Sequence, residues 1–149
     1  MVKAKYVLVF VLIAAVLLGA PGSVANANAN KITGGGWFID DSGNKITFGF
    51  DGKQTPEPPL HKYIAKGQFQ LVDHASGDRI HGIIEEIKPG SLAFTGSCSI
   101  NGQGDYTFYV RFSDRGKPGV EPGDEIYVAI ESPMRFYEGE LKGGNIKVH

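Results

Sequence analysis

Four carboxylates gather in and beside one long loop of the sequence, where glycine and proline are also frequent. They are Asp114, Glu121, Asp124 and Glu125. Calcium takes oxygen ligands from loops of this kind, so the group predicts a calcium site, and we expect no other cofactor. Its spacing matches neither an EF-hand nor a glycine-rich calcium repeat. A solvated turn, in which Asp114 stabilises its own backbone, explains the same residues and stays open as the alternative.

Residue patterns for hydrolysis are sparse. Glu85 and Glu86 form the most visible carboxylate pair, but adjacent residues of a strand point to opposite faces. They could flank one glycosidic bond only if a bulge intervened. The chain has no G-x-S-x-G motif, and Cys98 lies in an alternating segment, where a buried, inert thiol is expected. We therefore expect no enzymatic activity.

Several aromatic residues are candidates for binding. Tyr109, Tyr127 and Tyr137 fall on the predicted outward faces of strands, where aromatic rings serve protein or carbohydrate contacts. The single tryptophan, Trp37, follows three glycines, which in a strand indicate a bulge or the close approach of another backbone. We interpret Trp37 as core filling over this glycine surface. An exposed platform for a sugar ring is the alternative.

Strands must position these residues, because apolar and polar side chains alternate along much of the chain. The clearest strands are Tyr106–Ser113 and Glu125–Glu131. Asn101-Gly102 fits a tight primed turn, residues 37–50 fit a hairpin, and the prolines of residues 51–60 predict a loop. The residues that the two clearest strands should bury are Phe108, Val110, Phe112, Ile126, Val128 and Ile130.

The whole pattern predicts an all-β fold. The 21 glycines and 8 prolines are scattered as turns, and no stretch after the N-terminal segment has helical spacing. About eight or nine short antiparallel strands result. They predict an antiparallel β-sandwich or a partly closed barrel.

The N-terminus has the pattern of a secretory signal. Two lysines and an apolar run over residues 6–18 precede the small residues Ser23-Val24-Ala25. We expect a signal peptide, helical in form, over residues 1–25, a linker over 26–30 and a single β domain over 31–149. An uncleaved membrane anchor is the alternative, although the apolar run is shorter than the roughly 20 residues of a spanning helix.

Composition restricts the partners. The formal net charge is −1, and loss of the two lysines of the signal segment brings it to −3. Because the chain has no run of Lys or Arg, we expect no basic patch and no nucleic-acid partner. Membrane contact is expected only through an uncleaved signal segment. The single cysteine allows no intramolecular disulfide.

Five motifs occur in one order along the chain: KITGGGWF, ITFGF, INGQGDYTFYV, SDRGKPG…GDEIYVAI and LKGGNIKVH. In this order they resemble a family of small secreted all-β domains of bacteria and archaea, found alone or appended to larger extracellular proteins. The resemblance covers Lys31–His149 and implies an extracellular β module without established catalytic activity. It carries over no functional residues. The chain departs from the family's pattern at Cys98 and at the inserted Val120-Glu121-Pro122.

Together these observations predict a non-enzymatic module, secreted or exposed on the cell surface, that acts in adhesion, matrix or envelope interaction. Its expected partner is an extracellular protein or glycan. One alternative is a subunit of an extracellular filament assembled by strand exchange, with the extended segment Ala27–Ile32 as donor, which implies self-association. The other is an extracellular glycan hydrolase.

Overall fold

The computed structural model describes residues 31–57, 62–88, 92–115 and 123–149. These residues form nine strands in one antiparallel sheet, with the order β8-β7-β6-β5-β4-β3-β2-β1-β9. The predicted all-β fold is therefore confirmed. The predicted signal peptide and linker lie outside the described residues. The strands are β1 (Lys31–Ile39), β2 (Lys45–Glu57), β3 (Lys62–Asp73), β4 (Arg79–Lys88), β5 (Ala93–Ile100), β6 (Gln103–Phe112), β7 (Glu125–Ile130), β8 (Arg135–Glu140) and β9 (Gly143–Val148).

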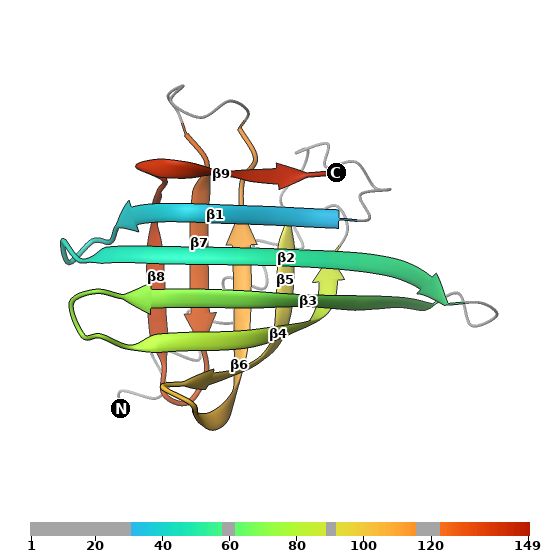
Figure 1. Cartoon of the computed structure of the whole chain (residues 1–149), viewed down its shortest axis with the longest axis horizontal. Coiled ribbons are helices and arrows are strands. Elements are labelled where there is room, and N and C mark those ends of the chain that lie inside the picture. The colour runs from blue at the N-terminus through green and yellow to red at the C-terminus, as the bar shows by residue number, and fades with distance from the viewer. Residues whose placement is uncertain (1–30, 58–61, 89–91, 116–122) are drawn as a thin grey trace, which may run out of the picture.

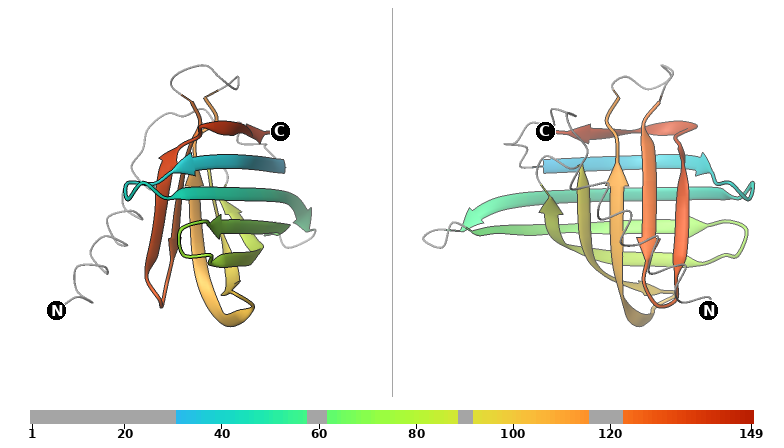
Figure 2. Two further views of the ribbon diagram at one scale, coloured as in Figure 1. Left: turned by 60° about the vertical axis from the view of Figure 1, so that its left-hand side comes forward. Right: turned by 180° about the vertical axis from the view of Figure 1, so that it is seen from behind.

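The single sheet curls back on itself into a half-barrel. In Figure 1, β9 and β1 to β4 run across the front, and β6 to β8 run crosswise behind them. The turned views of Figure 2 show the two layers facing each other, with the sheet bending through β4 and β5. In the described ranges, no helix has the length and apolar character needed to span a membrane.

The core lies between the two layers and is rich in phenylalanine. Phe50 of β2 and Phe94 of β5 have ring centroids 4.9 Å apart, and Phe69 of β3 and Phe108 of β6 have theirs 5.2 Å apart. These pairs join the front layer to the back, and each pair adds about 0.5–1.5 kcal/mol to the effect of burial alone. The six core residues predicted from the two clearest strands are all buried.

The turn predicted at Asn101-Gly102 is present in the structure. Asn101 has φ 54° and Gly102 has φ 75°, so both central residues are in the left-handed region that a type I′ turn requires. The turn joins β5 to β6, as predicted. On β5, Cys98 is 4% exposed and unpaired with another cysteine, which confirms the buried thiol.

The loop predicted over residues 51–60 is wrong in its first part. β2 continues through Glu57, and Pro56 pairs with Tyr63 of β3. β1 pairs with β2 only as far as Lys53, so among the described residues no strand lies beside Pro56 on that side, and the missing N–H of proline is tolerated there. The β2–β3 ribbon consequently extends beyond the other strands, on the right of Figure 1.

Candidate functional site

The predicted acidic loop supplies hydrogen-bond acceptors to the edge of the sheet. Asp124 is 7% exposed; its Oδ2 accepts the backbone N–H of Ile146 at 2.8 Å, and its Oδ1 accepts that of Arg115 at 2.7 Å. Asp114 Oδ2 accepts the N–H of Val148 at 3.1 Å. Ile146 and Val148 belong to β9, the last strand of the sheet. The two carboxylates therefore cover N–H groups that an edge strand would otherwise leave open.

The remaining acids of this loop are less tightly held. Glu125 is exposed and accepts a hydrogen bond from Arg115 Nη2 at 3.3 Å, whereas Glu121 lies outside the described residues. Within the residues that the structure does describe, no group of three or more His, Cys, Asp or Glu side chains is arranged to hold a metal ion. Calcium at this loop stays a prediction.

The three predicted tyrosines do not share one environment. Tyr109 and Tyr127 lie partly exposed on the outer face of the sheet, the side away from the core. Tyr137 is 5% exposed and belongs to the core, so its predicted outward position is wrong. Its neighbour Phe136 takes the outer position instead, opposite Ala129 and 6.2 Å from the ring of Tyr127. We name Tyr109, Tyr127 and Phe136 the aromatic surface.

Tyr109 has unused hydrogen-bonding capacity. Its hydroxyl oxygen is buried and has no hydrogen-bond partner in the described part of the chain. Burial raises the pKa of Tyr109 and of Tyr127 to about 12, so both phenols are neutral at any physiological pH. Arg111 lies over the ring of Tyr127, 5.9 Å from its centroid. The aromatic surface thus combines residue types that are enriched at interfaces.

Trp37 lies on the outer face, so its interpretation as core filling is wrong. Phe38, the next residue, is fully buried, whereas Trp37 is partly exposed. A Cβ at Gly143 would collide with Nε1 of Trp37, which means that the ring rests against the bare backbone of β9. Lys45 Nζ lies 4.9 Å from the ring centre. Because Lys45 is exposed and flexible, it can move aside for a ligand or add a charge beside the ring.

A flat strip of backbone continues from Trp37 across β1 and β2. Gly35 and Gly49 face each other directly in the register, and Asn145 and Gln70 flank them on β9 and β3. A Cβ at Gly35 would come no closer than 3.6 Å to another atom, and one at Gly49 no closer than 3.9 Å. Neither glycine has a positive φ. Packing and backbone geometry therefore do not require glycine at these two positions.

The neighbouring glycines of the same triplet behave differently. A Cβ at Gly34 would enter the ring of Phe50, and one at Gly36 would meet the backbone of Gly143. The contact at Gly36 bears out the predicted close approach of another backbone at the triplet, whereas the contact at Gly34 is with a side chain. Gly35 alone has room for a side chain. We name Trp37, Gly35, Gly49, Gln70 and Asn145 the Trp37 face.

Four lysines gather at one end of this same outer face. Lys31 of β1 is directly opposite Lys53 of β2, which is directly opposite Lys66 of β3. Lys147 of β9 is exposed in the adjacent row, opposite Thr33. The expectation that the chain has no basic patch is wrong. The lysines are far apart in sequence, and only the strand register brings them together. We name Lys31, Lys53, Lys66 and Lys147 the lysine row.

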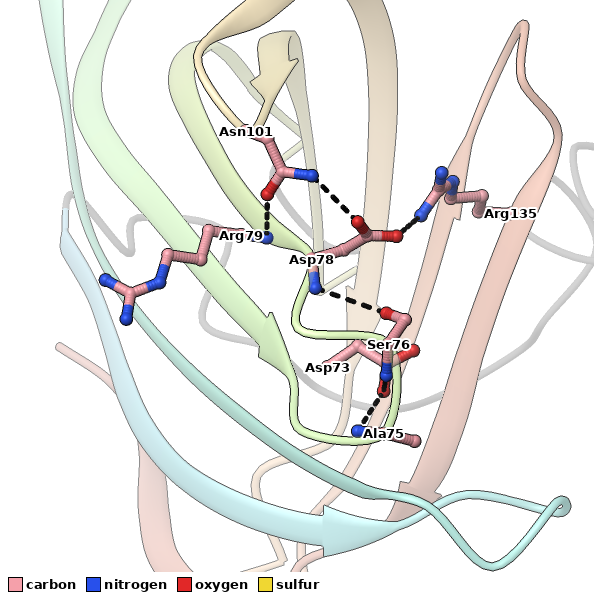
Figure 3. A network of polar contacts seen from close by, with 7 residues as sticks. All are labelled: Asp73, Ala75, Ser76, Asp78, Arg79, Asn101 and Arg135. Carbon is pink, nitrogen blue, oxygen red and sulfur yellow. Dashed lines mark hydrogen bonds and ion pairs between the residues drawn. The ribbon is translucent and has the colours of Figure 1, made fainter.

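A polar network closes the opposite end of the half-barrel (Figure 3). Asp78, in the β3–β4 turn, pairs with Arg135 at the start of β8 and accepts a hydrogen bond from Asn101 Nδ2 at 2.8 Å. Asn101 Oδ1 in turn accepts the N–H of Arg79 at 2.9 Å. The hydrogen bond from Arg135 is the main reason that the pKa of Asp78 is lowered, and the same bond raises the pKa of Arg135. This network is structural, because it ties two turns to an edge strand.

Glu85 and Glu86 could flank one glycosidic bond only if a bulge lay between them, and the structure has that bulge. The register between β4 and β5 shifts between Ile84 and Glu86, so a bulge is present. Glu86 lies opposite Thr95 on the outer face, and Glu85 Oε1 accepts a hydrogen bond from Ser97 on that face. Both carboxylates are exposed. A glycosidase acid needs an environment that keeps it protonated, and an exposed position does not supply one.

Comparison of the chain with protein-family models, with curated proteins and with solved structures finds no match in any of the three. The resemblance in motif order therefore stays a prediction.

Proposed function

We propose that this protein is a secreted or cell-surface, non-enzymatic module that binds an extracellular glycan on the Trp37 face. The observation that carries the proposal is the outward position of Trp37 at the end of a flat, polar sheet surface. Aromatic rings offer an apolar body for the face of a sugar, and the amides of Gln70 and Asn145 offer donors and acceptors for hydroxyl groups. Asn145 Oδ1 is buried and has no hydrogen-bond partner in the described part of the chain, so the amide would have to turn outward to bind a sugar.

The two glycines support the same proposal. A glycine inside a strand destabilises it by roughly 0.5–1 kcal/mol relative to alanine, because more backbone freedom is lost on folding. Gly35 and Gly49 bear this cost although a side chain would fit. Glycine in a strand also marks places where a ligand approaches the backbone closely. A backbone surface without side chains beside Trp37, on which a ligand can lie, would explain why both positions are glycine.

The alternatives receive less support. In strand exchange, the donor segment Ala27–Ile32 would have to pair with another chain, yet Ile32, in its described part, already pairs with Gly52 on one side and Val148 on the other. The free side of β9 is already bonded to Asp114 and Asp124. In glycan hydrolysis, Glu85 and Glu86 would act from exposed positions, as described above.

Glycan binding is tested with an array of extracellular glycans and matrix polymers, using Trp37→Ala and Gly49→Thr. Trp37→Ala removes the ring. Gly49→Thr places a side chain on the bare backbone surface, and threonine favours a strand conformation. Each is expected to weaken binding about tenfold, which corresponds to about 1.4 kcal/mol. Gly49→Thr should leave the melting temperature unchanged or higher.

The matched control is Tyr127→Ala, which removes a ring of the aromatic surface on the other layer. It is expected to leave glycan binding intact. Loss of binding with Tyr127→Ala and none with Trp37→Ala would move the binding site to the aromatic surface. Full binding by both Trp37→Ala and Gly49→Thr would refute the proposed face.

A further inference from the structure

The lysine row has an unfavourable arrangement for a surface that serves only stability. Lys31, Lys53 and Lys66 occupy directly opposed positions in three adjacent strands, and side chains in such positions lie on one face about 5 Å apart. All three are exposed, as is Lys147. Like charges placed directly opposite each other destabilise a sheet.

Carboxylates do little to relieve this repulsion. None of the four lysines forms an ion pair with a carboxylate in the part of the chain that the structure describes. The neighbouring row of the register reads Lys147, Thr33, Asp51 and Gln68, and it contains one acid. Glu85 and Glu86 lie on the same face of β4, but they contact Ser97 and Lys88 rather than the four lysines. This local excess of positive charge stands on a chain whose formal net charge is −1. The positive charge is therefore concentrated at one end of the outer face.

The lysine row and the Trp37 face form one continuous surface. The outer residues of β1 are Lys31, Thr33, Gly35, Trp37 and Ile39, which alternate with inward residues such as Ile32 and Phe38. Trp37 lies six positions after Lys31 along the strand, a distance of about 20 Å. A linear polymer lying along β1 would contact the ring at one end and the lysines at the other.

We propose that the ligand is an anionic polysaccharide, whose carboxylate or sulfate groups bind to Lys31, Lys53, Lys66 and Lys147. The proposal rests on the glycan-binding function above and specifies the class of glycan. Lysine suits this ligand because its ammonium is a point charge on a flexible stem, which can follow unevenly spaced acidic groups. The aromatic ring and the amides next to the row suit the ring faces and hydroxyl groups of a sugar polymer.

The test measures binding of the full chain to a sulfated polysaccharide, a uronic-acid polysaccharide and a neutral polysaccharide at low and at physiological salt. Lys53→Gln removes the central charge of the row. It is expected to weaken binding of the two anionic polymers about fivefold and to reduce the salt dependence of binding. Because it relieves repulsion, it should leave the melting temperature unchanged or higher. Lys142→Gln, an equal change at an exposed position between β8 and β9, should bind like the original protein.

The outcomes separate this inference from the proposed function. Binding of anionic polymers that falls with Lys53→Gln and with Trp37→Ala supports both. Binding of the neutral polymer that falls with Trp37→Ala alone overturns the lysine inference and keeps glycan binding. Equal binding of single-stranded DNA or of anionic lipid vesicles would mean unselective attraction of negative charge and would also overturn it, as would an equal effect of Lys53→Gln and Lys142→Gln.

Discussion

Asp78 is the residue at which separate parts of the chain meet. Its carboxylate receives Arg135 from β8 and Asn101 from the β5–β6 turn, while its own N–H donates to Ser76 Oγ at 3.2 Å. A hydrogen bond to a charged group stabilises a protein more than a neutral one does. One side chain thereby holds three segments that are distant in sequence.

Replacing Asp78 with asparagine should therefore destabilise the protein by about 1–2 kcal/mol at neutral pH. The pKa of Asp78 is lowered in the folded state from an ordinary value of 3.8. Its contribution is thus fully present above that ordinary value and is lost as the pH falls through the lower folded pKa. Thermal unfolding of the original protein and of Asp78→Asn should differ at pH 7, begin to converge below about pH 4 and coincide only below the folded pKa. The control Asp41→Asn, at an exposed turn, should show no such convergence; a constant difference for Asp78→Asn at all pH values would contradict the prediction.

Single residues also show what the alternation of apolar and polar side chains can and cannot predict. Alternation correctly assigned Phe108 and Val110 to the core because polar residues separate them. Phe136 and Tyr137 are adjacent aromatic residues, so local pattern cannot say which faces inward. The turn after β7 decides it, because it sets Ile130 opposite Arg135 and so fixes the phase of β8. Trp37 was misassigned because a large aromatic residue is usually buried, whereas here it rests on a glycine of another strand.

At the scale of elements, the edge strand β9 depends on the acidic loop between β6 and β7. Asp124 accepts one N–H from the loop itself and one from Ile146 of β9. Exposed strand edges promote association with other chains, and proteins cover them by several devices. Here the device is a pair of carboxylates that replace a neighbouring strand. The sequence showed the acids but not their partners, since Asp124 and Ile146 are brought together only by the curl of the sheet.

Replacing Asp124 with asparagine keeps the shape of the side chain but offers one oxygen instead of two. One of the two N–H groups would then face an amide donor, at a cost of about 1–3 kcal/mol. Chemical denaturation should show this loss, and size-exclusion chromatography should show larger species at high concentration because the β9 edge is open. Glu125→Gln, a nearby exposed acid, should change stability by less than about 0.5 kcal/mol. A monomeric Asp124→Asn protein of unchanged stability would show that the carboxylate does not protect the edge.

At the scale of the molecule, the strand register creates features that no stretch of the chain contains. The number and type of strands followed from alternation and turn residues. The lysine row did not, because Lys31, Lys53 and Lys66 are separated by 22 and 13 positions and become neighbours only once β1, β2 and β3 pair in one register. Short patterns predict strands well, whereas surfaces that run across strands require the register.

The whole fold is held by one core, without a disulfide, and Cys98 reports on that core. Its side chain is 4% exposed, and burial raises the pKa of the thiol to about 11. At pH 8 roughly one thiol in a thousand would be ionised, and the thiolate is the reactive form. Alkylation should therefore require unfolding, and its rate should rise with denaturant in proportion to the unfolded fraction.

An anionic polysaccharide that binds only the folded form should slow the alkylation. A free small thiol, measured in parallel, should react at the same rate with and without the polymer. Fast alkylation of Cys98 in the absence of denaturant would mean that the half-barrel opens locally at β5, without global unfolding.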